Sequence, residues 1–555
     1  MLPYINIPFV FVADKLGAST DELKLIASFL LSYPLAGILK RIPDKKLWQK
    51  NVFIIGVSIF YLIGLFDLWA GVRTLLISSV GAYAIAAFVE GPYMPWIGFV
   101  FLMGHMSVNH IHRQTVADPS QVDITGAQMV LVMKLTAFCW NVYDGTLPEA
   151  DLTDFQKVRA LKKLPDYLDF AGFVLFFPSL FAGPAFDYVD YRNWLEGTMF
   201  ELPPGTDPSK APPTRKKRKI PRSGTPAAWK AAAGLAWIFG FLQFAGWYNT
   251  DLLLSPKYMQ YNIFRRVWLL HMLGFATRMK YYGVWSLTEG ACILSGIGYK
   301  GVDPTTGKAD WNRLQNVRPL SIELAQNSHA YLGHWNINTN HWLRNYVYLR
   351  VTPKGKKPGF RATMATFVTS AFWHGFYPGY YMSFVLASFM QNIAKNTRRL
   401  VRPFFVTPDG KSPTPQKRYY DIFSYLVTQL AFSYTVAPFV LLSFSASITV
   451  WSRVHFYCIV GVVASSLFLI SPGKPWLQQQ VNARKKAAPV RSESTDSVAG
   501  LQGRGTTLGL PDDPGREIDE IVDELRAEIE KRRRSGKPVP ESLRKAIEES
   551  TGAKY

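Results

Sequence analysis

A histidine in an apolar stretch is the first residue of this chain that could do chemistry. His374 lies within TSAFWHGFYPGYYMSF (369–384), where nearly every neighbour is apolar, aromatic or small. A neutral imidazole in such surroundings can accept a proton from a weak nucleophile. The alternative is a core histidine whose ring nitrogens are satisfied by packing partners. Gly375 and Pro378 break or bend a helix at this point, which favours the functional interpretation.

An asparagine-rich block lies shortly upstream of this histidine. Residues 334–350, HWNINTNHWLRNYVYLR, contain four asparagines among tryptophans, histidines, arginines and tyrosines. An asparagine amide can position a substrate hydroxyl or stabilise a developing oxyanion, while a histidine acts as general base. An acyl thioester is the natural electrophile for such a pair, because it is already activated and needs no metal.

The motifs of several other enzyme classes do not occur in the chain. There is no G-x-S-x-G elbow, no Gly-rich phosphate loop and no H-E-x-x-H sequence. The three cysteines are far apart and show no ligand spacing, so we expect neither a disulfide framework nor a metal site. These observations favour a direct acyl transfer between two bound substrates, with no bound cofactor.

The composition is that of a membrane protein. Of the 555 residues 48% are hydrophobic, and only 18% are charged, which is below the roughly 25% of soluble domains. A first span is expected near 25–39, and no signal peptide is apparent. Long apolar segments approach or exceed the roughly 20 residues that cross a bilayer as a helix; they are 52–70, 75–103, 228–254, 422–442 and 448–470. We predict an all-α polytopic membrane protein with roughly ten or eleven transmembrane or re-entrant helices around an intramembrane chamber.

The formal net charge of +22 resides mainly in loops of the membrane-associated part. Such loops normally face anionic lipid on the cytoplasmic side, so we expect no nucleic-acid binding. Basic loops at 354–361 and 398–417 flank the 34 residues 362–395, which is short for two full spans. We therefore expect a bent or re-entrant path that breaks near 374–379, with His374 inside the membrane.

The domain organisation follows from these segments. Residues 1–473 form one multi-span domain, into which a flexible, basic, Pro-rich loop at 203–226 is inserted. A flexible polar linker is expected at 474–515. An amphipathic helical tail, expected to be cytoplasmic, occupies 516–555.

Ionisable residues interrupt two apolar stretches. Lys134 and Asn141 lie within 123–145, and Arg278, Lys280 and Glu289 lie within 278–301. Such residues usually face a cavity or one another. A plain alternative to a functional role is an internal pair between Glu289 and either Arg278 or Lys280.

Several blocks together resemble a known family. WNINTNHWLRNYVYLR followed by AFWHGFYPGYYMSF is similar to the membrane-bound O-acyltransferases, and specifically to their lysophospholipid acyltransferases. The blocks DITGAQMVLVMKLTAFCWNVYDG, FAGPAFDYVDYRNW and RMKYYGVWSLTEGACILSGIGYKG extend the likeness over roughly residues 15 to 470. The resemblance is nearest to fungal broad-range glycerophospholipid enzymes.

The resemblance implies roles for particular residues. His374 would be the catalytic general base, and Asn336 its positioning or oxyanion partner; Asn338 and Asn340 are the nearby alternatives. Acyl-CoA would be the co-substrate, and the acceptor the free glycerol hydroxyl, at sn-2, of a lysophospholipid. Further substrate-binding candidates are Trp335, Asn338, Trp342, Tyr348, Trp373, Tyr377, Tyr380, Arg278, Lys280 and Glu289. Arg278, Lys280 and the loop at 354–361 could contact CoA phosphates or could merely set the topology.

The same likeness suggests an endoplasmic reticulum membrane protein that functions in phospholipid synthesis and remodelling, with membrane lipids as partners and a homodimer left open. Other acceptors known for relatives are sterols, diacylglycerol and proteins. A transporter would also explain buried charges, but it would predict repeat symmetry between the halves. Head-group and acyl-chain preference are not encoded in any pattern that we can interpret.

Overall fold

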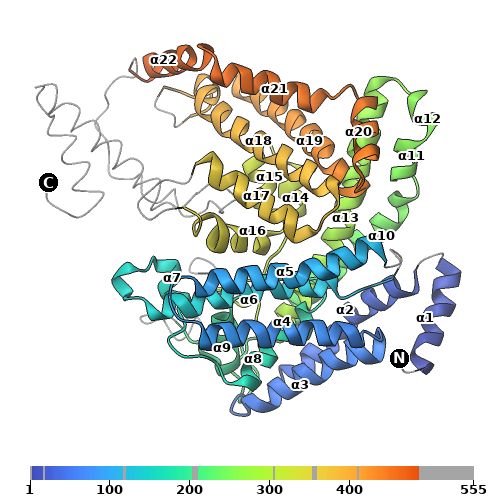
Figure 1. Ribbon diagram of the computed structural model, residues 1–555, viewed down its shortest axis with the longest axis vertical. Coiled ribbons are helices and arrows are strands. Elements are labelled where there is room, and N and C mark those ends of the chain that lie inside the picture. The colour runs from blue at the N-terminus through green and yellow to red at the C-terminus, as the bar shows by residue number, and fades with distance from the viewer. Residues whose placement is uncertain are drawn as a thin grey trace, which may run out of the picture.

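The computed structural model describes residues 3–16, 19–116, 121–202, 211–303, 307–352, 359–408 and 412–486. Figure 1 shows long helices that lie side by side and run across the page, in a lower and an upper group. The predicted helical tail at 516–555 lies outside the described residues. The predicted flexible linker at 474–515 is wrong in its first part, because residues up to 486 form a helix.

The lower group contains the N-terminal helices. Its long members lie side by side, and shorter helices follow them in the chain. These elements are α1 (Pro3–Leu16), α2 (Thr20–Leu39), α3 (Leu47–Ile59) with a π-helical turn (Phe60–Leu65), α4 (Trp69–Phe88), α5 (Met94–Thr115), α6 (Thr125–Thr146), α7 (Asp154–Arg159), α8 (Tyr167–Val174) and α9 (Tyr188–Glu196). Short 3-10 turns lie at Glu149–Asp151, Phe177–Ser179 and Thr198–Phe200.

Two long helices pack together and join the lower group to the upper one. They are α10 (Gly224–Ala245) and α13 (Ile263–Ser295), connected through α11 (Thr250–Leu254) and α12 (Pro256–Met259). A small antiparallel ribbon follows, in which β1 (Gly301–Val302) pairs with β2 (Ala309–Asp310), Gly301 opposite Asp310.

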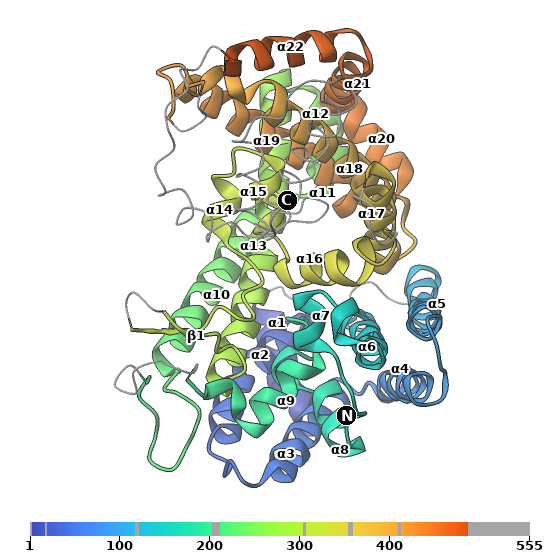
Figure 2. The same ribbon diagram turned by 90° about the vertical axis from the view of Figure 1, so that its left-hand side faces the viewer.

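The upper group contains the C-terminal helices and both predicted catalytic residues. Its elements are α14 (Pro319–Glu323), α15 (Ser328–Gly333), α16 (Ile337–Leu343) with a π-helical turn (Arg344–Tyr348), α17 (Phe360–His374), α18 (Pro378–Leu400), a 3-10 turn (Arg402–Phe405), α19 (Lys417–Leu441), α20 (Phe444–Arg453), α21 (Tyr457–Ile470) and α22 (Gly473–Lys486). Figure 2 shows α16 at the boundary between the two groups, next to α6.

Among the described residues, five helices are long and apolar enough to cross a membrane, or six if the bent pair α20 and α21 counts as one span. The predicted ten or eleven spans therefore stay a prediction. Two predicted segments differ in detail from the observed helices. The segment at 75–103 falls into α4 and α5, because the chain turns at Gly91 with φ +87°. The segment at 448–470 is bent by 83° where His455 and Phe456 adopt positive φ.

The predicted break beside His374 is confirmed. Helix α17 ends at His374, Gly375 has φ +123°, and Pro378 starts α18. Proline is well suited to the first turn of a helix, and glycine tolerates a φ that other residues avoid. His374 is therefore the last residue of one helix at a sharp turn into the next.

Replacing Gly375 by alanine should destabilise the protein. A Cβ at this position would lie 3.1 Å from His110 Nδ1, at a backbone φ that L-residues rarely adopt. Backbone strain of this kind costs about 1–3 kcal/mol. We expect Gly375→Ala to lower the Tm of the purified protein in micelles. Gly461→Ala, whose Cβ would meet nothing within 4 Å, is the control and should leave the Tm unchanged. Equal Tm values for the two variants would contradict this account.

Candidate active site

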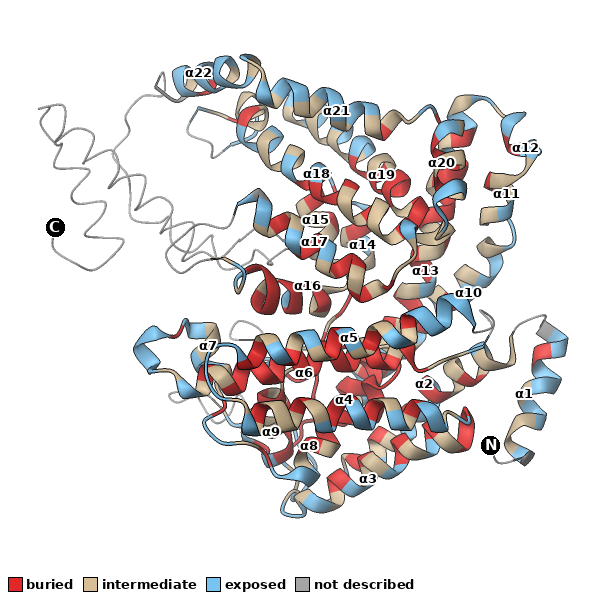
Figure 3. Ribbon diagram, in the orientation of Figure 1, coloured by how far each residue is buried: buried red, intermediate tan, exposed pale blue. Residues whose placement is uncertain are grey.

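Helix α6 is the platform on which the candidate site is built. Almost every side chain from Thr125 to Val142 is buried, and Figure 3 shows α6 and α16 among the most deeply buried helices. A helix that is buried all round belongs to the core of a large protein or a bundle. Polar groups on such a helix need partners, because burying an unpaired polar group is costly. For Thr136, Asn141 and Asp144 those partners come from the segment that carries the predicted catalytic asparagine.

Two polar contacts hold α16 to the middle of α6. Thr339 Oγ1 lies 3.3 Å from Met133 Sδ, and Trp342 Nε1 donates to Thr136 Oγ1 at 2.8 Å. Both contacts join residues that are 206 positions apart in the chain.

Two further contacts extend this series to the end of α6. We call the four contacts between α6 and residues 339–350 the ladder. The Tyr346 hydroxyl donates to Asn141 Oδ1 at 3.0 Å, and Arg350 forms a bidentate ion pair with Asp144 at 2.8 and 2.5 Å. The offsets are 205 and 206 residues. A constant offset means that residues 339–350 run parallel to α6 in one fixed register. The sequence analysis did not predict this ladder. The one signal for it was Asp144, a carboxylate near the end of the apolar stretch 123–145.

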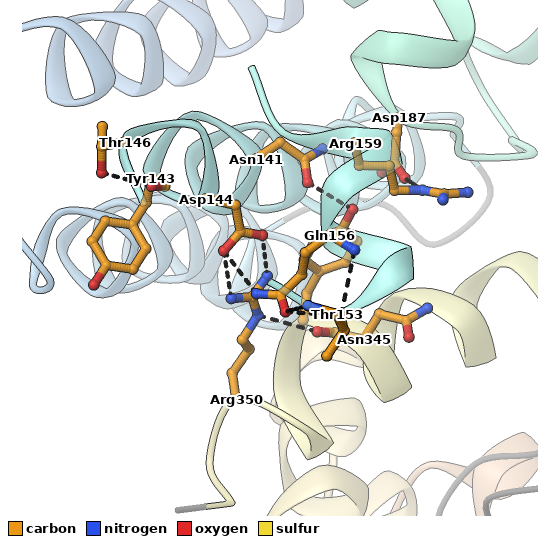
Figure 4. Close-up of polar contacts among 11 residues, drawn as sticks. Asn141, Tyr143, Asp144, Thr146, Thr153, Gln156, Arg159, Asp187, Asn345 and Arg350 are labelled. Carbon is orange, nitrogen blue, oxygen red and sulfur yellow. Dashed lines mark hydrogen bonds and ion pairs between the residues drawn. The ribbon is translucent and has the colours of Figure 1, made fainter. Parts of the chain in front are cut away.

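The Asp144–Arg350 ion pair lies inside a larger polar cluster, drawn in Figure 4. Gln156 Nε2 donates a third hydrogen bond to the Asp144 carboxylate at 3.0 Å, and the Arg350 guanidinium stacks 4.2 Å from the Trp140 ring centroid. The Asp144 side chain is 1% exposed and that of Arg350 11%. The pair is thus a buried salt bridge that joins α6 to the end of the Asn336-bearing segment.

Asn336 immediately precedes α16 in a left-handed conformation, φ 44° and ψ 55°. Asparagine adopts this region more readily than most residues. Its side-chain oxygen accepts a hydrogen bond from Thr339 Oγ1 at 2.9 Å, and its carbonyl oxygen accepts one from the Asn340 amide at 3.0 Å. Within the described residues, the side-chain N–H groups of Asn336 donate no hydrogen bond. The contact of Thr339 with Met133, three residues further along the chain, sets the start of α16 on this part of α6.

His374 is fixed at nearly the same level of α6 through its neighbour Trp373. Trp373 Nε1 donates to the Met129 carbonyl at 3.0 Å, and the Trp373 carbonyl accepts a hydrogen bond from His110 Nε2 at 3.0 Å. The rings of Trp342 and Trp373 also pack together, with centroids 6.0 Å apart. Met129 and Met133 are one turn apart on α6, so the segment that carries His374 and the segment that carries Asn336 contact neighbouring turns of this helix.

An aromatic cradle surrounds the His374 ring. Phe439 meets it edge-on at 4.9 Å, Phe384 stacks against it at 5.2 Å, and Tyr380 lies at 5.5 Å, all measured between ring centroids. Within the described residues, neither ring nitrogen of His374 has a hydrogen-bond partner. The structure therefore holds this imidazole by its faces and leaves its nitrogens available.

The other predicted substrate-binding residues divide into two sets. Trp373 and Tyr380 contact His374, and Tyr377 packs against Tyr380 at 6.0 Å. Trp335 instead packs on Tyr281, Tyr282 and Trp285 of α13. Asn338 is used in loop packing, since its amide donates to Asn316 Oδ1 at 3.1 Å, and Trp342 and Tyr348 are buried.

The alternative of an internal helix–helix pair is confirmed for Glu289, but the partners suggested for it, Arg278 and Lys280, are wrong. Residues nine and eleven positions apart on one helix are separated by about 13 and 16 Å along its axis, so their side chains do not meet. Glu289 pairs instead with Lys230 of α10 at 2.8 Å, and Lys280 pairs with Glu22 at 3.3 Å.

Arg278 is also committed to a protein partner. Its guanidinium donates two hydrogen bonds of 2.7 Å to Glu323 of α14. The third predicted CoA contact, the basic loop at 354–361, lies mostly outside the described residues. Of the three, only Lys280 is a half-exposed cation held by a single exposed partner.

Comparisons with known proteins identify a family and several relatives whose sequences are similar to this chain. Residues 117–437 match the membrane-bound O-acyltransferase family. The chain is 44% identical over 488 residues to a lysophospholipid acyltransferase of Schizosaccharomyces pombe, covering 88% of this chain and 94% of that protein. It is 42% identical to a lysophospholipid acyltransferase of Saccharomyces cerevisiae, covering 86% and 78%. It is 29% identical to the human membrane-bound glycerophospholipid O-acyltransferase 2, covering 79% and 82%.

Proposed function

Because this chain belongs to the membrane-bound O-acyltransferase family and is an integral membrane acyltransferase, we propose that it acylates lysophospholipids. The acyl donor is acyl-CoA, and the acceptor is the free glycerol hydroxyl at sn-2. The names of the two fungal relatives support the acceptor class. The enzyme then functions in phospholipid synthesis and remodelling at the endoplasmic reticulum membrane, with its C-terminal tail in the cytoplasm.

The mechanism is supported by the contacts that hold the two segments on neighbouring turns of α6, Trp373 with Met129 and Thr339 with Met133, from which we infer that Asn336 and His374 face one reaction site. In the proposed reaction, a ring nitrogen of His374 takes the proton of the lysophospholipid hydroxyl. The hydroxyl oxygen attacks the thioester carbonyl carbon, and a tetrahedral oxyanion forms. The carbon–sulfur bond then breaks, the carbonyl reforms as an ester, and the CoA thiolate takes the proton from the imidazolium. Proton and electron pairs balance without a metal.

Asn336 supplies the neutral donor that this scheme needs. Its side-chain oxygen is held by Thr339, which turns the amide N–H groups toward other acceptors. We propose that these N–H groups hydrogen-bond either the attacking hydroxyl or the oxyanion. A fixed donor in a water-poor site stabilises developing charge without reorganisation. The rings of Tyr380, Phe384 and Phe439 reduce water access to His374, which disfavours hydrolysis of the thioester.

The acceptor assignment can be tested directly. The purified full chain in micelles is given radiolabelled acyl-CoA and a panel of acceptors: lysophospholipids with different head groups, a sterol and diacylglycerol. We expect labelled diacyl phospholipid only, and phospholipase A2, which cleaves at sn-2, should release the label. Label transfer to the sterol or to diacylglycerol alone would overturn the proposed acceptor, and label resistant to phospholipase A2 would overturn the sn-2 position.

Replacing Asn336 should lower turnover more than it affects binding. Removing one oxyanion donor typically reduces kcat about 10²–10³-fold. We expect Asn336→Ala to show this loss, with little change in the KM for acyl-CoA. Asn345→Ala is a control from the same segment, outside the turn of α6 that His374 approaches. An Asn336→Ala enzyme with wild-type kcat would remove Asn336 from the mechanism and return attention to Asn338 and Asn340.

A further inference from the structure

A strongly basic surface of the described chain lies far from His374 in sequence and is not used by the proposed mechanism. Residues 40–46 and 211–223 contain ten lysines and arginines and a single aspartate, Asp44. We call the lysines and arginines of these two segments the basic patch. Most of their side chains are exposed, including the run Arg215, Lys216 and Lys217.

The basic patch is ordered, although the sequence predicted a flexible loop. Thr214 bridges to Pro221, and the resulting turn docks on the α2–α3 connection (Figure 2). Arg218 Nη2 donates to the Arg41 carbonyl at 2.9 Å, and the Lys219 amide donates to Asp44 Oδ2 at 2.9 Å. These contacts set two basic segments, nearly 180 residues apart in the chain, side by side on one surface.

The position of the patch is at the level of a membrane surface. It joins the ends of three helices that are long and apolar enough to span a membrane, namely α2, α3 with its π-helical turn, and α10 continued to Leu254. Trp48 and Trp229 lie within two turns of these helix ends and are 58% and 73% exposed. Exposed tryptophans near span ends are typical of the lipid head-group region.

Within the described residues, the two carboxylates that contact the patch, Asp44 and Glu201, are far fewer than its ten cations. Asp44 already accepts from the Lys219 amide and lies 3.4 Å from Lys50 Nζ, while Glu201 pairs with Lys219 at 3.3 Å. Burial, together with the guanidinium groups of Arg215 and Arg41, lowers the pKa of Lys40 to about 8. Because these cations repel one another, anions from outside the chain would stabilise them.

We propose that the basic patch binds the head groups of anionic phospholipids in the membrane that the enzyme spans. The order of the turn, the head-group level and the excess of ten cations over the single carboxylate Asp44 within segments 40–46 and 211–223 all favour lipid phosphates and carboxylates as the occupants. Each basic residue near an anionic surface strengthens such binding by roughly fivefold. The proposal is independent of the acyl-transfer mechanism.

Fluorescence resonance energy transfer from the protein to labelled lipids can test the proposed lipid binding without measuring acyl transfer. All three native cysteines are buried, so Ala211→Cys, at an exposed position beside the patch, adds one reactive thiol for a donor fluorophore. The full-length protein is reconstituted into phosphatidylcholine nanodiscs that contain a trace of acceptor-labelled phosphatidylserine or acceptor-labelled phosphatidylcholine, with the label on the acyl chain. We expect several-fold more transfer to the serine lipid, and loss of this preference at about 1 M salt, where the Debye length is roughly 3 Å.

Charge-removing variants identify the residues responsible. In the Ala211→Cys background, R215Q/K216Q/K217Q should make transfer to the two lipids equal. The matched control, R398Q/R399Q/K474Q, removes three exposed cations elsewhere and should keep the preference. The proposal is overturned if the protein with an unsubstituted patch shows equal energy transfer to both lipids. It is also overturned if both triple variants lose the preference for the serine lipid to the same extent. An unchanged lipid preference in R215Q/K216Q/K217Q together with a raised KM for acyl-CoA would overturn it as well, because the patch would then be a CoA contact.

Discussion

His374→Phe will keep the fold and lose acyl transfer. A general base contributes about 10²–10⁴-fold to rate, so kcat should fall by that factor while the KM for acyl-CoA changes little. Phenylalanine retains an aromatic ring for the cradle of Tyr380, Phe384 and Phe439 but has no nitrogen to take the proton. It therefore separates chemistry from packing better than alanine, which would leave a cavity among these rings.

The measurement combines initial rates in micelles with the Tm of each variant. His271→Phe is the matched control, because His271 is a half-buried histidine on α13 whose Nδ1 lies 2.8 Å from Ser433 Oγ, away from the cradle. It should retain activity within a few-fold. A folded His374→Phe enzyme that turns over within threefold of wild type would show that His374 is only a packing residue, the alternative that the sequence left open.

The sequence predicted the local features of this site well. The break at His374 follows from Gly375 and Pro378, which act within a few residues, and the helix indeed ends there. The long apolar helices follow from composition over windows of about 20 residues. Both kinds of signal are short-range, so they need no knowledge of how the helices pack.

What the sequence did not predict depends on contacts between distant segments. The ladder joins residues about 206 positions apart, and its register is set by the burial of α6 on all sides, which no local pattern encodes. The same applies to Glu289, whose partner Lys230 lies on α10 rather than on its own helix. The basic loop at 203–226 was expected to be flexible on composition, yet residues 211–223 dock through backbone groups that composition does not report.

The second large effect is expected at the Asp144–Arg350 pair. Removing one partner of a buried ion pair leaves an uncompensated charge and typically costs about 3–5 kcal/mol. Arg350→Met should therefore lower the free energy of unfolding by this order, because Gln156 alone cannot neutralise the Asp144 carboxylate. Asp144→Leu should lower the free energy of unfolding by a similar amount, because it leaves the buried Arg350 guanidinium beside Trp140 without its carboxylate partner.

The double variant D144L/R350M distinguishes charge burial from loss of contact. Replacing a buried pair by apolar residues of similar volume is often neutral or stabilising, so the double variant should be more stable than either single one. Unfolding is followed by titration with denaturing detergent in mixed micelles. Glu22→Gln, which breaks the exposed Lys280–Glu22 pair, is the control and should cost under about 1 kcal/mol. If the double variant loses as much free energy of unfolding as the two single variants together, the two residues are not energetically coupled and this account is wrong.

Activity in the stable double variant then reports what the ion pair does for the site. Arg350 is the last rung of the ladder that registers the Asn336-bearing segment on α6, while Trp373 fixes His374 to the same helix independently. Loss of the specific bidentate geometry should loosen Asn336 relative to His374, and a misplacement of about 1 Å can cost about 10²-fold in rate. We therefore expect a stable D144L/R350M protein with reduced kcat and an almost unchanged KM for acyl-CoA. Wild-type kcat in that variant would mean that the three other contacts between α6 and residues 339–350 keep Asn336 in place without the ion pair.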